Sequence, residues 1–264
     1  MGGAYDDVAF LANSANRVAV LEALEAGPRH RDELIAQVDV SRVTLSRILA
    51  DLEDRRWVER AGQECWLTPL GAWVLEEFTD FLDVMATEHR LREVIPWFPS
   101  EEVPFDVRCL REATVCVPSS TNVWAHVQRG ADCFRSARWA RVLSSQTAPP
   151  IIEATAVAVA ERGQVFEAVL TRKLVETILD DSTMGPQFVE ILGAPTASVA
   201  VYDEPLPVVT FITDGTVGIP LTDDEDIARA LILSDDETIY DWAETTFEHY
   251  RDRAEPLDRD VLAL

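Results

Sequence analysis

The chain has 264 residues, of which 47% are hydrophobic, and a net charge of −24, so its apolar content suffices for a buried core in one large or two modest domains. It contains no run of about 18 to 20 apolar residues and begins without a signal peptide pattern, so we expect a cytoplasmic protein with no membrane partner. The four cysteines and four histidines form neither a Cys-x-x-Cys pair nor a metal-ligand spacing. We therefore expect free thiols, no metal and no cofactor.

Helical periodicity dominates the first 55 residues. The apolar spacing predicts a helix from Asp6 or Asp7 to the strong Gly27-Pro28 stop, followed by a short helix over 31–38. After a tight turn, Ser41 is a good N-cap for a third helix that ends near residue 55. Two short helices joined by a tight turn indicate a helix-turn-helix.

A hairpin and a long helix follow. Short β-runs at 57–60 and 65–68 flank a turn that contains Gly62, and they predict a wing. Thr68 and Pro69 then begin a helix that extends to Arg92. Its apolar stripe is formed by Leu75, Phe78, Leu82 and Met85. This stripe packs either on a second subunit or on the first helix of the same chain.

The third helix is predicted to place one side on DNA. At about 100° per residue its leucines and Ile48 cluster on one side, which must face the core. The remaining positions, with the wing, form the predicted DNA site: Arg42, Val43, Thr44, Ser46, Arg47, Arg60 and Gln63. Arginine pairs with guanine edges, small apolar groups contact thymine methyls and hydroxyls hold phosphates. Residues 41–50 contain no carboxylate, whereas Glu59 and Glu64 weaken the assignment on the wing. The alternative is that the arginines only solvate an exposed face.

The segment over 40–53, with Trp57-Val58 and residues 67–71, resembles archaeal winged-helix regulators of the MarR and ArsR kind. With the C-terminal sequence included, nearly the whole chain resembles haloarchaeal regulators whose effector domain is named after the methanogenesis regulatory protein. The resemblance implies a transcriptional regulator that binds a double-stranded DNA operator in the major groove through residues 41–55. It also implies a homodimer and a small-molecule effector.

The charge agrees with a haloarchaeal origin. The chain has 47 acidic and 23 basic residues, and Lys173 is its only lysine. A lysine-poor chain that keeps arginine and is rich in carboxylates is typical of proteins from concentrated salt. Net charge is an argument about medium and solubility rather than fold. The alternative is an acid-rich mesophilic protein that repels nucleic acid.

The periodicity changes after the long helix, which predicts two domains. We expect a winged helix-turn-helix domain with its dimerisation helix over 1–95 and an effector domain over 100–256, joined where Pro96 and Pro99 exclude a helix. In the second domain, β-rich runs at 114–117, 141–143, 166–170 and 199–202 alternate with helical runs, which favours a mostly parallel sheet. Three antiparallel strands and a closing helix over 237–253 follow. The fold class is thus a two-domain α+β or α/β protein.

Ligands bind beyond the carboxyl ends of strands in such sheets. Polar residues at three of these ends form the predicted effector site: Ser144, Ser145, Thr147, Thr171, Arg172, Tyr202 and Asp203. Hydroxyls with one arginine suit a small polar or anionic metabolite. The alternative is that they are ordinary turn and cap residues.

Two other classes of function remain to be weighed. The order of elements also resembles half of a phospholipase D-like fold, as in sugar-responsive archaeal regulators of the TrmB type. Such an enzyme needs a His-x-Lys nucleophile, and no histidine here has lysine two positions later; a G-x-S-x-G elbow and a P-loop are also missing from the sequence. We therefore expect no enzyme. A protein-interaction adapter that does not bind DNA would need a degraded recognition helix, and this one is intact.

Overall fold

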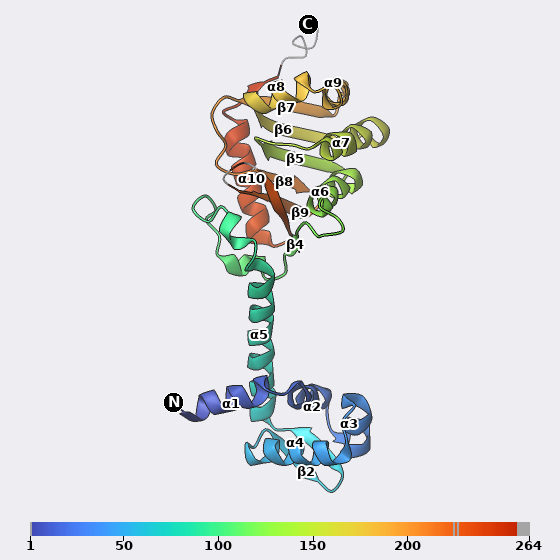
Figure 1. Cartoon of the computed structure of the whole chain (residues 1–264), viewed down its shortest axis with the longest axis vertical. Coiled ribbons are helices and arrows are strands. Elements are labelled where there is room, and N and C mark those ends of the chain that lie inside the picture. The colour runs from blue at the N-terminus through green and yellow to red at the C-terminus, as the bar shows by residue number, and fades with distance from the viewer. Residues whose placement is uncertain (1, 224, 226, 258–264) are drawn as a thin grey trace. The chain divides into compact units, whose positions relative to one another are not determined.

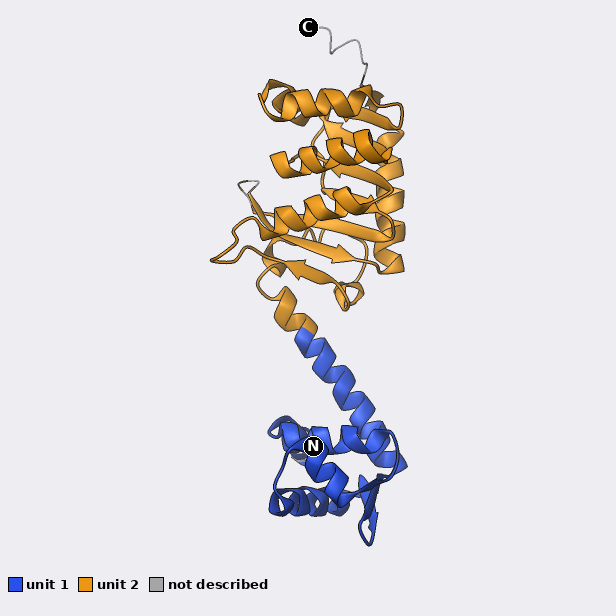
Figure 2. Ribbon diagram, turned by 90° about the vertical axis from the view of Figure 1, so that its right-hand side faces the viewer, with its two compact units in different colours: residues 1–86 blue, residues 87–264 orange. Residues whose placement is uncertain are grey.

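The computed structural model describes residues 2–223, 225 and 227–257. The chain divides into two compact units between Ala86 and Thr87 (Figure 2). This division lies inside helix α5 (Pro69–Leu91), earlier than the predicted junction at 95–100. The residues around that junction belong to the second unit because Val94 and Phe98 are buried in its core. Among the described residues, no helix has the length and apolar character needed to cross a membrane.

The first unit has the order helix, helix, strand, helix, helix, strand, strand, helix. The elements are α1 (Gly2–Ala12), α2 (Ala15–Glu25), β1 (Arg29–His30), α3 (Arg31–Val38), α4 (Arg42–Asp54), β2 (Val58–Ala61), β3 (Glu64–Leu67) and α5. The helix-turn-helix and the wing are therefore confirmed. The single first helix is wrong, because Asn13 and Ser14 interrupt it and Ser14 adopts an extended backbone with φ −156°. The short strand β1, which pairs with β3, was also missed.

The core of the first unit explains the orientation of α4. Leu45, Leu49 and Leu52 are fully buried, and they pack with α2 and with the start of the wing in one hydrophobic cluster. The opposite side of α4 must then face away from the core. Helix α5 joins this cluster closely, since a Cβ atom at Gly71 would lie 1.9 Å from the carbonyl oxygen of Trp57.

The second unit is a mixed sheet with helices on both faces (Figure 1). After two 3-10 helices, η1 (Ile95–Trp97) and η2 (Val107–Leu110), its elements are β4 (Thr114–Cys116), α6 (Ala125–Ser136), β5 (Trp139–Ser144), α7 (Pro149–Arg162), β6 (Val165–Thr171), α8 (Arg172–Asp180), α9 (Met184–Gly193), β7 (Ala197–Tyr202), β8 (Thr210–Thr213), β9 (Thr216–Thr222), β10 (Ala228–Ser234), α10 (Glu237–Arg251) and β11 (Glu255–Pro256). Helices α6 to α9 share a core with one face of the sheet, and α10 shares a core with the other.

The sheet is less parallel than the alternation of elements suggested. Its order is β11-β7-β6-β5-β8-β9-β10-β4, in which only β5, β6 and β7 of the described strands pair in parallel. Strand β4 lies at the far edge of the sheet, because it pairs, in antiparallel orientation, with β10, the last strand of the β8-β9-β10 meander. The predicted mixed α/β domain is confirmed, whereas the expectation of a mostly parallel sheet was wrong.

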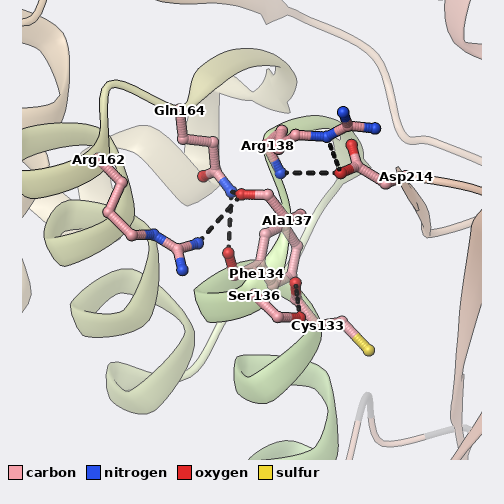
Figure 3. Close-up of polar contacts among 8 residues, drawn as sticks. All are labelled: Cys133, Phe134, Ser136, Ala137, Arg138, Arg162, Gln164 and Asp214. Atoms are coloured by element: carbon pink, nitrogen blue, oxygen red, sulfur yellow. Dashed lines mark hydrogen bonds and ion pairs between the residues drawn. The ribbon is translucent and has the colours of Figure 1, made fainter.

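A buried glutamine holds the C-terminal end of α6 (Figure 3). Gln164 is 1% exposed, and its Nε2 donates to the carbonyl oxygens of Phe134 at 2.8 Å and Ala137 at 2.9 Å. The guanidinium of Arg162 also donates to the Ala137 carbonyl, at 3.1 Å. The last carbonyls of a helix have no partner within the helix, so these side chains fix the end of α6 against α7 and β6.

Candidate functional site

The first turn of α4 presents a polar edge. The hydroxyl of Ser41 accepts from the backbone N–H of Thr44 at 3.1 Å and lies 2.9 Å from its hydroxyl, so Thr44 is part of the helix cap. Arg42 is 82% exposed and has Asp32 at 3.5 Å, and Val43 is 80% exposed. An apolar side chain so exposed at the start of a helix, beside an arginine, is available to touch another molecule.

Arg47 differs from the arginines that hold the first unit together. It is exposed on the side of α4 opposite the buried leucines, and no hydrogen bond or ion pair joins it to any described residue. Arg55, in contrast, donates to Asp7 at 2.9 Å and lies 3.7 Å from the centre of the Phe10 ring, and Arg17 donates to the carbonyl of Phe10 at 2.6 Å. Arg47 is thus an arginine of this unit with no hydrogen bond or ion pair to another described residue.

Ser46 has a different position from the one expected for a phosphate contact. Its hydroxyl accepts from the guanidinium of Arg31 at 2.5 Å and donates to the carbonyl of Arg42 at 2.7 Å. Ser46 therefore fixes Arg31 beside α4. Sequence reasoning missed Arg31, because its link to a residue fifteen positions later exists only after α3 and α4 have packed.

The two predicted residues of the wing, Arg60 and Gln63, have different surroundings. Arg60 pairs with Glu53 at the end of α4, and this hydrogen bond raises the pKa of its guanidinium. The side chain is therefore committed within the unit rather than offered to a phosphate. Gln63 is exposed beside Gly62, which has φ +64° at the tip of the turn, and its carbonyl accepts from the backbone of Arg31 at 3.0 Å.

The polar residues predicted at the strand ends do not form one site. The hydroxyl of Ser144 donates to the carbonyl of Gln146, and Thr171 caps α8. Arg172 pairs with Asp203 at 2.5 Å. Tyr202 packs against Tyr250 of α10, with ring centres 5.2 Å apart, and burial together with Glu204 raises the pKa of its phenol. Ser145 is exposed. Most of these residues therefore cap a helix, stabilise a turn or form an ion pair with one another, as the alternative interpretation held.

Two of these residues, Ser144 and Thr147, line a cavity of about 140 Å³ on the face of the sheet covered by α6 and α7. Most of its wall is apolar, with contributions from Phe134, Ile152, Leu170, Phe188, Phe211 and Leu231, and none of its lining residues is charged. His126, in the first turn of α6, lines the same cavity and is 5% exposed. Burial lowers the pKa of its imidazole.

Sequence comparison assigns both domains. Residues 5–90 match the HVO_A0261 N-terminal domain, and residues 123–253 match the middle domain of the methanogenesis regulatory protein FilR1. Each domain is thus similar to one of these two families. The resemblance of the C-terminal sequence to the methanogenesis regulatory type is thereby confirmed, and the chain is a two-domain protein of regulator type. No curated protein matches it significantly.

Solved structures give only distant likenesses. An archaeal chromatin protein, TrmBL2, aligns over 96% of this chain and 99% of its own, with 17% identity and a TM-score of 0.42. NucT from Helicobacter pylori aligns over 55% of this chain and 98% of its own, with 14% identity and a TM-score of 0.43. The phospholipase D family member Nuc from Salmonella typhimurium aligns over 55% and 97%, with 18% identity and a TM-score of 0.41. At such values none of the three assigns a function.

Proposed function

We propose that the protein is a sequence-specific DNA-binding transcriptional regulator that inserts α4 into the major groove. The observation that carries the proposal is the exposed side of α4, where residues 41–50 include Arg42, Val43 and Arg47 and no carboxylate. Arg42 has one acidic neighbour from α3, Asp32 at 3.5 Å, and Arg47 has none among the described residues. Eight arginines against sixteen carboxylates give residues 1–85 an acidic balance, so this edge is a local exception. Arginine and a small apolar side chain are the groups that read guanine edges and thymine methyls.

Selection from random DNA tests this proposal. The full chain is used to enrich fragments from a randomised pool, and the affinity of the enriched sequence is then measured for three proteins. We expect Arg47→Ala to weaken binding by about 5- to 150-fold, since a lost bidentate base contact costs about 1–3 kcal/mol. Arg92→Ala is the matched control, because it removes an exposed arginine outside α4 that pairs with Glu88 of α5. Equal affinities of the two variants, both folded, would reject α4 as the reading element.

We further propose that the regulator is a homodimer that pairs through α5. Leu75 and Phe78 of the predicted stripe are buried within the first unit, but other apolar side chains of α5 are exposed. These are Leu70, Trp73, Phe81, Leu82, Val84 and Met85. Leu70, Trp73, Phe81 and Val84 fall within about 80° on one side of the helix at 100° per residue. Glu77 lies between the two pairs of this stripe and accepts a hydrogen bond from Trp73. Exposed apolar side chains that gather on one side of a helix mark a protein interface, and a second copy supplies a matching set.

Sedimentation measures this pairing. We expect Phe81→Glu to convert the dimer to a monomer, since it places a charge in the centre of the stripe, whereas Val165→Glu in the second unit leaves the dimer intact. Val165 is a fair control because it is similarly exposed. A wild-type protein that sediments as a monomer at 50 µM, roughly the range in which weak dimers form, would reject this interface.

The second unit is proposed to sense an effector rather than to catalyse a reaction. The name of the matching family supports a regulatory role, and the sequence lacks the His-x-Lys motif that a phospholipase D-type nucleophile requires. The net charge of −24 with a single lysine supports a concentrated-salt environment. Hydrolysis of a phosphodiester by the purified chain would overturn the assignment of a sensing rather than a catalytic role to the second unit.

A further inference from the structure

The cavity in the second unit has the dimensions and lining of a ligand site. Its volume of about 140 Å³ is close to that of an engineered apolar cavity of about 150 Å³ that stays dry and takes up benzene. The residues that line it include no Asp, Glu, Lys or Arg, so it offers nothing to pair with a charged molecule. The half-buried loop over 146–148, between β5 and α7, forms part of its wall.

Three of the four hydroxyl groups in the lining, all but that of Thr147, are already used. Thr155 donates to the carbonyl of Ile151 at 2.8 Å, Thr210 donates to that of Gly218 at 3.0 Å, and Ser144 donates to that of Gln146 at 2.6 Å. These hydroxyls stabilise the walls. They leave no free donor of their own for a guest.

His126 is different. Its Nδ1 is buried and has no hydrogen-bond partner within the described part of the chain. A hydrogen bond to the backbone of Ala228 opposes the fall in its pKa, and an imidazole that donates there through Nε2 keeps Nδ1 unprotonated in its neutral form. A buried acceptor without a partner is costly and rare in folded proteins. Because His126 lines the cavity, a bound molecule with a donor group is the candidate for this missing partner.

We propose that this cavity binds a small, uncharged and mainly apolar molecule, about one aromatic ring in size, whose hydroxyl or N–H group donates to Nδ1 of His126. The inference gives the proposed sensing role a site and a class of ligand, and for its regulatory meaning it rests on that proposed function. It replaces the polar or anionic metabolite expected from the strand ends with a neutral, apolar one.

Phenol and toluene are suitable probes, because they differ by the donor group while sharing the ring. We measure the dissociation constant of each for the full chain by calorimetry, in the absence of DNA. The ratio of the toluene constant to the phenol constant is expected to fall about tenfold in His126→Leu, as loss of one hydrogen bond predicts. His249→Leu is the matched control, since His249 is exposed on α10, which covers the other face of the sheet, and its ratio stays at the wild-type value.

An equal ratio in wild type and His126→Leu, or no binding of either compound by the wild type, overturns the proposal. If His126→Leu fails to fold, the wild type alone decides the class of ligand: benzoate is expected to bind at least tenfold more weakly than phenol, and benzoate binding as tight as phenol overturns it. The DNA measurement is independent. Failure of phenol binding with intact binding of the enriched DNA rejects the cavity site alone, whereas the reverse outcome rejects the DNA role alone.

Discussion

In both units most polar side chains have partners within the unit, but the side chains without a partner lie at the surface of the first unit and in the interior of the second. In the first unit Arg17, Arg55 and Arg60 are bound to Phe10, Asp7 and Glu53, and Arg47 is left at the surface. In the second unit hydroxyls are bound to backbone carbonyls, whereas four buried polar atoms of the described residues have no partner, namely Nδ1 of His126 and one side-chain oxygen each of Gln164, Gln187 and Glu244. Of these four residues, only His126 lines the cavity. The comparison teaches that a candidate binding residue can be recognised as a polar side chain without an intramolecular partner among many that have one. One unit offers it to a charged surface and the other to an uncharged guest.

The largest expected effect is the destabilisation of the first unit alone. Gly71→Ala places a Cβ atom 1.9 Å from the backbone oxygen of Trp57, which neither backbone can avoid cheaply. We expect the first unit to lose about 2–4 kcal/mol of stability, with DNA binding lost and phenol binding kept. Hydrogen exchange followed by mass spectrometry reports each unit separately. Gly193→Ala is the control, since a Cβ atom there meets nothing within 4 Å. Loss of protection in both units would contradict their independence.

The second effect concerns salt. Arg42 and Arg47 give a dimer two to four phosphate or base contacts, so we expect a log-log slope of affinity against salt of about −2 to −4. Binding of the enriched DNA, titrated from about 0.5 to 2 M KCl, measures the slope. A slope near −10, as a strongly basic repressor gives, would show that other cations of the chain carry the binding.

A third test acts on the second unit. Gln164→Leu leaves the carbonyls of Phe134 and Ala137 without their donor, and we expect a cost of about 1–3 kcal/mol in the unfolding of this unit. The affinity for DNA is expected to stay unchanged. Gln128→Leu serves as the control, since it removes an exposed glutamine of α6 that accepts from the exposed Asn122. An unaltered unfolding midpoint for Gln164→Leu would mean that α6 is not held by this side chain.

The smallest effect is a dependence on pH. Burial lowers the pKa of His126 below its ordinary 6.5, so the unfolded chain binds a proton that the folded chain does not. The wild type should therefore lose stability relative to His126→Leu as the pH falls from 7 to 5, by at most about 1.4 kcal/mol per pH unit. Denaturant midpoints of the two proteins at several pH values give the difference. Parallel curves over this range would place a charged imidazole in the folded protein.

These two regions also differ in how far the sequence could predict them. The leucine spacing of α4 fixes which side is buried, so the exposed positions of Arg42 and Arg47 followed from helical geometry. The pairing of Arg60 with Glu53 did not, since it joins the wing to the end of α4. The cavity could not be predicted from the sequence either. His126 belongs to no sequence motif, and its neighbours Leu170, Phe211 and Leu231 come from β6, β8 and β10. The sequence predicted antiparallel strands after the parallel ones, but not the order of these strands in the sheet.

The contacts of Phe10 bear on the amino-acid composition of the chain. Two guanidinium groups, those of Arg17 and Arg55, lie 3.9 and 3.7 Å from the centre of this ring, while each also donates a hydrogen bond elsewhere. A planar guanidinium can stack and donate at once, whereas a lysine ammonium is a compact, strongly hydrated point charge. A lysine at either position would give up the planar contact with the ring. Arg17 and Arg55 therefore serve this unit through their shape as well as through their charge.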